Sequence, residues 1–457
     1  MSNGSFLDLL TQIFEGKWGK WIINLVVIPA LLFAALWLPP ISLRERVLEA
    51  GYTTIDDETG GSVLDPDGTQ ITILPEGMEA PLRIRLSSIP RIDFLRGAGG
   101  IGKAAESIPQ YLEMKSPLYK VNFRGTMPTS VILTVPIPND AEPHETLDLY
   151  YWDGSAWRWL PHQLIPEDEI LEARIDFVPQ AFAVMQTKLT PPLISADLPH
   201  GGSLTSEAKE SLVEVNPQGL YLEGDGTIGG RMRELTPEER SASLFIIPTI
   251  TNWGPDGIVR SDYIDNLLVD TALQDKHIRE ILKFVVQNHY SGIDIYYREF
   301  SPDLRADFVN FIRKLADALH RENKILSIRV DPPTQIAEDR WETGIYDWYA
   351  LGQAVDLFKI PAIPDPRAYA PGGQMDQLLT WATGQVDRYK IQLVVSMRSV
   401  EKVGNTLILK PYREVLETLA ASIRADKEVA APGEEVTFTL EGLAQVAGLQ
   451  RDPNTGH

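Results

Sequence analysis

One short run near the middle of the chain brings together side chains that could do acid and base chemistry. It reads Ser291-Gly292-Ile293-Asp294-Ile295-Tyr296-Tyr297-Arg298-Glu299. The apolar first half and polar second half predict a buried β-strand with a site at its tip. Successive strand side chains point to opposite faces, so Asp294, Tyr296 and Arg298 should share one face and Glu299 should point to the other. A carboxyl group there could act as a general acid or base, whereas a guanidinium, with a pKa above about 12, could not.

Two amphipathic segments flank this run and would hold it in place. Apolar residues recur at helical spacing over 275–288 and again over 304–319, which predicts a helix on either side of the strand. A strand between two such helices is the repeat unit of an α/β protein.

Seven candidate strands follow one another from residue 193 onward. They are Leu193–Ala196, Leu212–Leu222, Leu244–Ile250, Gly292–Tyr297, Ile325–Val330, Leu357–Ile360 and Ile391–Met397. A TIM-type (β/α)8 barrel needs eight parallel strands. We therefore expect residues 189–457 to form an α/β barrel of this type that is truncated before its last strand or left open.

The central run resembles the signature strand of glycoside hydrolase family 18, the chitinases and their spore-cortex and chitinase-like relatives, which reads D-G-x-D-x-D-x-E. The resemblance implies that the last Glu donates a proton to the glycosidic oxygen. It also implies that the Asp two residues earlier steers the substrate's own acetamido group, which is the nucleophile. Gly292 and Asp294 match the pattern, whereas Ser291, Tyr296 and Arg298 stand at the places of the first Asp, the third Asp and the Glu. The resemblance thus implies the barrel and a sugar-shaped groove more strongly than it implies hydrolysis.

A first hypothesis is a catalytically degenerate module that binds N-acetylated glycans of the chitin or peptidoglycan type. Aromatic residues near predicted strand ends would stack on sugar rings, and Arg298 would hydrogen-bond hydroxyl or carboxylate groups. The candidate substrate-binding residues are Trp253, Tyr296, Tyr297, Arg298, Trp341 and Lys359. The alternatives are that Asp294 and Arg298 are ordinary polar groups of a barrel, and that the protein is a structural cell-envelope protein.

A second hypothesis is an active glycosidase in which Glu299 is the acid and Asp294 the other catalytic residue. It requires a bulge after Tyr296, which would turn Glu299 into the mouth and Arg298 out of it. The hydroxyl of Tyr296 would then orient the acetamido group, because a phenol can accept a hydrogen bond from an amide.

The amino-terminal part predicts a membrane anchor. Trp21–Leu38 contains no charged residue and as a helix would span about 27 Å, close to the thickness of a bilayer core. A cleavable signal peptide is the alternative, but Pro39 and Pro40 follow where small residues would be wanted. We expect residues 1–45 to form a cytoplasmic stub and anchor, with the bulk of the chain outside the cytoplasm.

Residues 50–188 predict an all-β sandwich. Turn signals such as Asp65-Pro66-Asp67-Gly68 separate short alternating runs. The order of turns and strands, with Trp152-Asp153-Gly154-Ser155-Ala156-Trp157 near its end, resembles the ZU-type module of netrin receptors and ankyrins. The aromatic cluster around Trp152 could be a sugar platform, but core packing is the favoured interpretation.

Composition narrows the classes of partner. The formal net charge is −21, which argues against nucleic acid, because phosphate binding needs clustered Lys and Arg. The sequence has no cysteine and its seven histidines show no helical metal-site spacing, so neither a metal site nor a cofactor is predicted. A glycan and, through Trp21–Leu38, a membrane are the expected partners.

Overall fold

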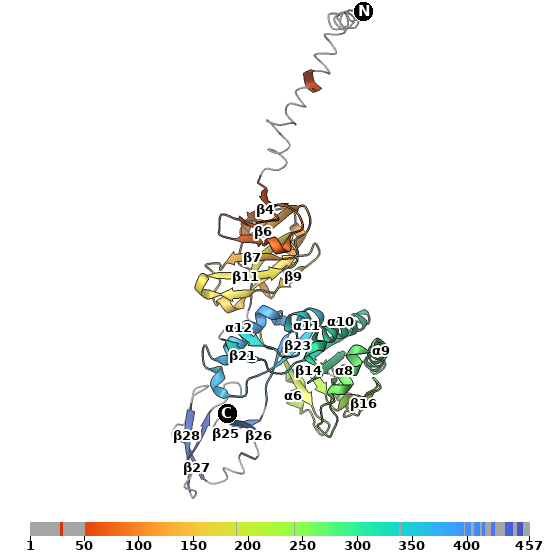
Figure 1. Cartoon of the computed structure of the whole chain (residues 1–457). Helices are drawn as coiled ribbons and strands as arrows, with labels where there is room; N and C mark the ends of the chain where they lie inside the picture. The colour runs from red at the N-terminus through yellow and green to blue at the C-terminus, as the bar shows by residue number, and fades with distance from the viewer. Residues whose placement is uncertain are drawn as a thin grey trace, which may run out of the picture.

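The computed structural model describes residues 28–30, 51–188, 190–241, 243–337, 340–396, 398–403, 406–411 and 414–415, and the strands 422–425, 435–441 and 446–450 (Figure 1). The predicted membrane segment Trp21–Leu38 lies outside these ranges apart from Ile28–Ala30, which are helical. Among the described residues, no helix has the length and apolar character needed to span a bilayer.

The first part of the fold is a sandwich of two antiparallel sheets. One sheet contains β1 (Thr53–Ile55), β4 (Leu82–Ile89), β5 (Leu112–Met114), β6 (Leu118–Arg124), β8 (Leu147–Trp152), β9 (Trp157–Leu160) and β12 (Ala181–Thr187), and the other contains β2 (Gly61–Leu64), β3 (Gln70–Ile73), β7 (Val131–Pro136), β10 (Gln163–Ile165) and β11 (Ile170–Ile175). On β7, Val131, Leu133 and Val135 are fully buried and the residues between them are not, the period of two expected for a strand with one face in a core. The all-β prediction for this part is confirmed.

Two sequence features of the sandwich take the structures expected of them. Gly68 closes the turn of the β2–β3 hairpin: its N–H donates to the carbonyl of Asp65, and its φ of +98° suits glycine. The aromatic cluster is buried, with Trp152 packed edge-to-face on Trp157. Core packing, rather than a sugar platform, is therefore its role in this structure.

The second part is a mainly parallel sheet with helices (Figure 1), in which only the short strand β16 (Ile228–Gly230) runs antiparallel to its neighbour among the described residues. Its seven strand positions, in order, are β13 (Ile194–Leu198), β14 (Leu212–Pro217) with β15 (Leu220–Leu222), β17 (Phe245–Ile246) with β18 (Thr249–Thr251), β19 (Gly292–Tyr296), β20 (Ile325–Arg329), β23 (Leu357–Pro361) and β24 (Ile391–Val394). The second position is broken at Gly219, whose φ is +117°, and the third is broken near Pro248, which has no N–H to give to a neighbour. The seven predicted strands are confirmed.

Contacts across the sheet show that it curls on itself. Arg329 of the fifth strand position bonds Asp197 of the first, and Lys359 of the sixth bonds Glu214 of the second. In a flat sheet, strands four positions apart would lie roughly 19 Å from each other, so these contacts require the curvature of a barrel. Within the described residues, β13 and β24 each pair on one side only, so no eighth strand closes the array there, in line with the expectation of an open barrel.

Helices surround the middle strands and bury their apolar faces on them. They include α8 (Ser261–Val269), α9 (Thr271–Gln287), α10 (Arg305–Arg321), α11 (Trp348–Ala354) and α12 (Gln374–Gln385). Helix α9 begins where the side chain of Asp270 accepts from the backbone N–H groups of Ala272 and Leu273. The predicted helices over 275–288 and 304–319 are thus confirmed as α9 and α10.

The two parts contact each other through a buried ion pair. Arg388, just after α12, donates from Nε and Nη2 to the carboxylate of Asp148 on β8 at 2.6 and 3.1 Å. Asp148 is fully buried, and nearby the rings of Tyr111 and Tyr389 lie 4.2 Å apart. The sandwich therefore packs against the α/β part near α12, away from the carboxyl ends of β18, β19 and β20.

Candidate functional site

Asp294 sits in the lumen of the barrel with both carboxylate oxygens occupied. Ser327 donates to Oδ1 at 2.6 Å, and Thr249 and Arg329 donate to Oδ2 at 3.0 and 3.1 Å. Burial alone would raise the pKa of Asp294, but the charges of Lys359 and Arg329, together with these hydrogen bonds, hold it below its usual value. Asp294 is thus a buried, ionised group with no exposed surface, and it is not a proton donor.

The surrounding lumen network is built from long-range pairs. Arg329 makes a two-pronged contact with Asp197, both bonds being 2.8 Å. Lys359 donates to Glu214 and Asn216, both at 2.9 Å, and lies 3.6 Å from Oδ1 of Asp294. We refer to Asp197, Glu214, Asn216, Asp294, Arg329 and Lys359 as the lumen network. Its three carboxylates face two cations, so with Asp294 ionised its formal charge is negative by one.

A second group lies at the carboxyl ends of the strands. Thr251 pairs with Tyr296, and Ile295 pairs with Ile328. Continuing this register by two or three residues brings Trp253, Arg298 and Asp331 to the same height above the lumen network. With Tyr296, these residues form what we call the mouth cluster.

The mouth cluster is tied together by one carboxylate and two rings. Asp331 Oδ1 accepts from Arg298 Nε at 2.7 Å and from the hydroxyl of Tyr296 at 3.1 Å. The rings of Trp253 and Tyr296 meet edge-to-face at 5.0 Å, and the guanidinium of Arg298 lies 5.8 and 5.7 Å from their centres. Burial, followed by the charge of Asp331, raises the pKa of Tyr296 to about 12, so its hydroxyl acts as a donor.

Asn252 fixes the backbone beneath Arg298. Its side chain donates to the carbonyl of Arg298 at 2.8 Å and accepts from the N–H of the same residue at 3.0 Å. Arg298 therefore points to the same face as Tyr296, as strand alternation predicts. Burial alone would lower the pKa of Arg298, but Asp331 and the nearby tyrosines raise it above its ordinary value, so the guanidinium remains charged.

Glu299 lies beyond the end of β19, in an exposed position with a left-handed φ of +58°. β19 pairs with both neighbours without a register shift. Those pairs end at Tyr296, and beyond them Arg298 reaches Asp331 in the mouth cluster through its Nε. Arg298 therefore faces the mouth, as strand alternation predicts, and the inward turn of Glu299 that the second hypothesis requires is not present in this structure.

Tyr297, predicted to bind substrate, lies on the other side of the strand. It is fully buried, and its hydroxyl is 2.6 Å from Nε2 of His277 on α9. Because Nδ1 of His277 faces the carbonyl of Gly226 at 2.8 Å, Nδ1 must be the donor and Nε2 must accept from Tyr297. Tyr297 thus belongs to the packing between strand and helices, because alternation turns it away from Tyr296.

Two other residues predicted to bind the substrate are buried away from the mouth cluster. Trp341, on β22 (Arg340–Glu342), which forms a hairpin with β21 (Thr334–Ala337), is 6% exposed. Lys359 is 2% exposed and belongs to the lumen network. Neither presents a surface for a sugar ring in this structure. Asp331 and Asn252 were not among the predicted site residues. Asp331 could have been found, because it directly follows the predicted strand Ile325–Val330.

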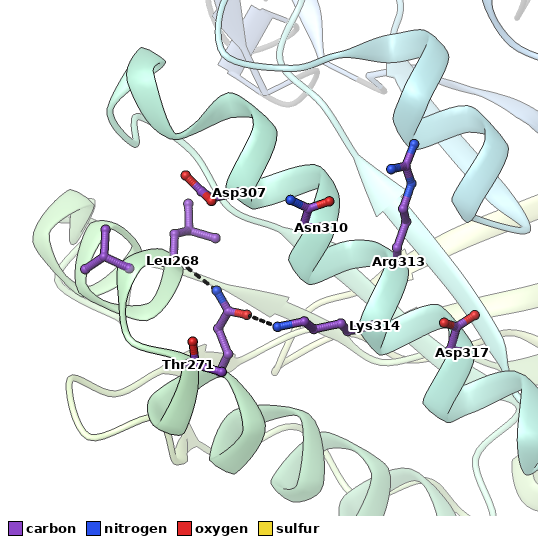
Figure 2. A pocket seen from close by; sticks show the side chains of 9 residues that line it. Leu268, Thr271, Asp307, Asn310, Arg313, Lys314 and Asp317 are labelled. Atoms are coloured by element: carbon purple, nitrogen blue, oxygen red, sulfur yellow. Dashed lines mark hydrogen bonds between the residues drawn. The ribbon is translucent and has the colours of Figure 1, made fainter. Parts of the chain in front are cut away.

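A cavity of about 580 Å³ lies elsewhere, between the junction of α8 with α9 and the outer side of α10 (Figure 2). Gln274 crosses it, donating to the carbonyl of Leu268 at 2.7 Å and accepting from Lys314 at 3.0 Å. Figure 2 shows Asp307, Asn310, Arg313 and Asp317 along the same side of α10. The cavity belongs to the helix layer and includes no residue of the mouth cluster.

No protein-family model matches this chain. The cortical fragment-lytic enzyme of Bacillus subtilis (strain 168) is 21% identical over 212 residues, which cover 42% of this chain and 48% of that protein. The chain thus spans about half the length of this curated relative, and the relative's activity does not pass to it by similarity alone.

Two solved structures are similar to this chain at low identity. A chitinase from Chromobacterium violaceum ATCC 12472 is 20% identical, with 56% of this chain and 84% of that chain covered, at a TM-score of 0.44. The spore cortex-lytic enzyme SleL of Bacillus megaterium QM B1551 is 14% identical, with 60% and 67% covered, at a TM-score of 0.45.

Proposed function

We propose that this protein binds N-acetylated glycans of the chitin or peptidoglycan type at the mouth cluster and does not hydrolyse them. In this proposal it is a catalytically degenerate relative of glycoside hydrolase family 18, held outside the cytoplasm by a membrane helix at Trp21–Leu38. The name of the Bacillus subtilis relative, an enzyme that acts on cortical fragments, supports the choice of glycan. The observation that supports the proposal is that Arg298, which the sequence resemblance aligns with the family's proton donor, is paired with Asp331.

Hydrolysis of a glycosidic bond in this family would require a group at the mouth cluster that can donate a proton. A positioned general acid contributes roughly 10²–10⁴ to the rate, and the charged guanidinium of Arg298 cannot supply that proton. Asp294 is buried and ionised within the lumen network, so it cannot take over the role. Asp331 already accepts hydrogen bonds from both Arg298 and Tyr296.

Partly exposed aromatic and polar groups converge at the mouth cluster and could bind a sugar. Trp253 and Tyr296 are both partly exposed, and such rings can stack on the C–H faces of sugars. Arg298 and Asp331 lie between them with side chains 35% and 25% exposed. They offer charged donors and acceptors to sugar hydroxyl or amide groups.

Calorimetry with chitin oligosaccharides and soluble peptidoglycan fragments tests the proposal. We expect saturable binding that Tyr296→Ala or Trp253→Ala abolishes, together with full recovery of intact ligand. Tyr349→Ala is the matched control, because Tyr349 is an exposed tyrosine on α11 and its loss should leave affinity unchanged. If no glycan of either type binds, the proposal is wrong and a structural envelope role is favoured.

Active hydrolysis with Glu299 as the acid remains a second candidate, favoured by the exposed carboxylate next to the mouth cluster. It would need the segment after Tyr296 to rearrange when substrate binds, because Arg298 holds the inward position. Turnover of chitooligosaccharides or muropeptides that Glu299→Gln abolishes would establish this candidate over the binding function. Turnover indifferent to that change would exclude Glu299 as the acid.

A further inference from the structure

We infer that the sugar bound at the mouth cluster carries a carboxylate, and that Arg298 is the residue that binds this carboxylate. This inference rests on the proposed glycan-binding function and narrows its ligand class. The acid could be a hexuronic acid or an N-acetylated sugar with a lactyl ether. Both place a planar, singly charged carboxylate beside a sugar ring.

The first observation is the unused end of the Arg298 guanidinium. Its Nε is bonded to Asp331, but within the ranges that the structure describes neither Nη atom has a hydrogen-bond partner. Arg329, two residues before Asp331, differs: its Nη atoms reach Asp197 and Asp294. Arg388 likewise uses Nη2 on Asp148. The two Nη groups of Arg298, which form a planar fork of N–H donors, are thus available to a ligand.

The second observation is that this fork is held rigidly. Asn252 bonds both backbone groups of Arg298, and Asp331 holds Nε. The guanidinium is also near the rings of Trp253 and Tyr296. A side chain that is ordered before the ligand arrives loses less entropy on binding, and a planar fork matches a carboxylate in two parallel hydrogen bonds.

The local charge limits which anion can bind. Asp331 already offsets the charge of Arg298, and the lumen network below carries one more carboxylate than cations. A doubly charged phosphate would meet this negative field, while a single carboxylate can gain two charge-assisted hydrogen bonds at less repulsion. A neutral sugar could use the fork through hydroxyl groups, but with weaker bonds.

The experiment compares ligands that differ in one charge. Calorimetry on the full chain would use four probes: a chitin tetrasaccharide, a glycan strand with free lactyl carboxylates, the same strand as its methyl ester, and a hexuronic acid oligosaccharide. We expect a free acid to bind about 10- to 100-fold more tightly than the ester or the neutral sugar, the range for charge-assisted hydrogen bonds. The lactyl and uronic arms show which acid is the ligand.

Substitutions of Arg298 test whether this residue causes the preference for the free acid. Arg298→Gln should remove the difference between acid and ester, and Arg298→Lys should retain only part of it, because an ammonium cannot form the fork. Arg174→Gln, at an exposed arginine on β11, is the control that should change nothing. If the neutral tetrasaccharide binds as tightly as both acids, or if Arg298→Gln leaves the preference intact, the inference is wrong and the proposed function stands. If none of the four probes binds, both are wrong.

Discussion

The lumen network and the mouth cluster contain similar side chains in opposite situations. In the lumen, Asp294 and Lys359 are buried and each has several partners. At the mouth, Arg298 and Asp331 are partly exposed, and the Nη atoms of Arg298 have no hydrogen-bond partner in the described residues. Removing one partner of a buried ion pair leaves an uncompensated charge and destabilises the fold, whereas an ordered, partly exposed charge with unused donors can bind a ligand. Asp294 has the surroundings of the first kind, and the proposed ligand contact of Arg298 is of the second kind.

Two neighbouring tyrosines repeat the contrast on one strand. The hydroxyl of Tyr296 donates to the partly exposed Asp331, and the hydroxyl of Tyr297 contacts the buried His277. Their opposite directions follow from the pleat of β19 alone. Changes to one should affect ligand binding, and changes to the other should affect stability.

The largest effect is expected in the lumen. Lys359→Met removes a cation from beside Glu214 and Asp294, leaving buried negative charge uncompensated, so unfolding free energy should fall by about 3–5 kcal/mol. Urea denaturation followed by circular dichroism measures this. Lys276→Met, at an exposed pair with Asp225, is the control and should have little effect. The double variant Lys359→Met/Glu214→Gln should regain part of the lost unfolding free energy, because it removes one of the uncompensated charges. If Lys359→Met alone lowers the unfolding free energy no more than Lys276→Met does, the lumen network does not have the structural role given to it here.

The next effect is a dependence of stability on pH. Burial lowers the pKa of His277 to about 4, below its value of about 6.5 in the unfolded chain. The unfolded state therefore binds the proton first, and stability that is complete above pH 6.5 should decline by about 3 kcal/mol as pH falls toward 4. Denaturation midpoints across this range measure the decline. His277→Gln should flatten that part of the profile; an equally steep profile in the variant would place the dependence elsewhere.

Removing the hydroxyl of Tyr296 or of Tyr297 should have smaller effects, one on glycan affinity and the other on stability. Tyr297→Phe leaves the acceptor nitrogen of His277 buried without its donor, which should cost about 1–3 kcal/mol of stability and leave glycan affinity unchanged. Tyr296→Phe loses a bond at the partly exposed mouth, so stability should hardly move while affinity falls. Thermal melts measure the stability of both variants, and calorimetry measures their glycan affinity. A reversed pattern would mean that the ligand site lies on the helix side of β19.

The smallest effect on stability is expected at Asp331. Asp331→Asn removes the charge of a partly exposed ion pair, which should change unfolding free energy by less than about 1 kcal/mol. Because Arg298 then keeps its charge uncompensated, affinity for a carboxylated glycan should rise. Melting curves and calorimetry with the same acidic glycan test this. A fall in affinity for that ligand would show that Asp331 contacts the sugar more than it restrains Arg298.

Local patterns in the sequence predicted the elements and the directions of side chains along β19. Periodicity located the seven strands and the helices α9 and α10, because both depend on neighbours a few residues apart. Alternation predicted that Tyr296 and Arg298 share a face. The same rule should have removed Tyr297 from the substrate-binding set, since Tyr297 must then face the helices.

The partners of those side chains could not be predicted from local patterns. Arg329 and Asp197 are 132 positions apart, and Lys359 and Glu214 are 145 apart. Their pairing depends on how far the sheet curls, which no single segment encodes. Asp331 was missed for a related reason: it meets Arg298 only because β19 and β20 are neighbours in register.

The central claim is that the mouth cluster holds a glycan and leaves it intact. Equilibrium dialysis of an acidic, N-acetylated glycan against the full chain, followed by mass analysis of the ligand, measures binding and cleavage together. We predict a bound fraction that Tyr296→Ala abolishes and a ligand recovered at its original length. Shortened products that disappear in Glu299→Gln, or the absence of any bound glycan, would contradict the account.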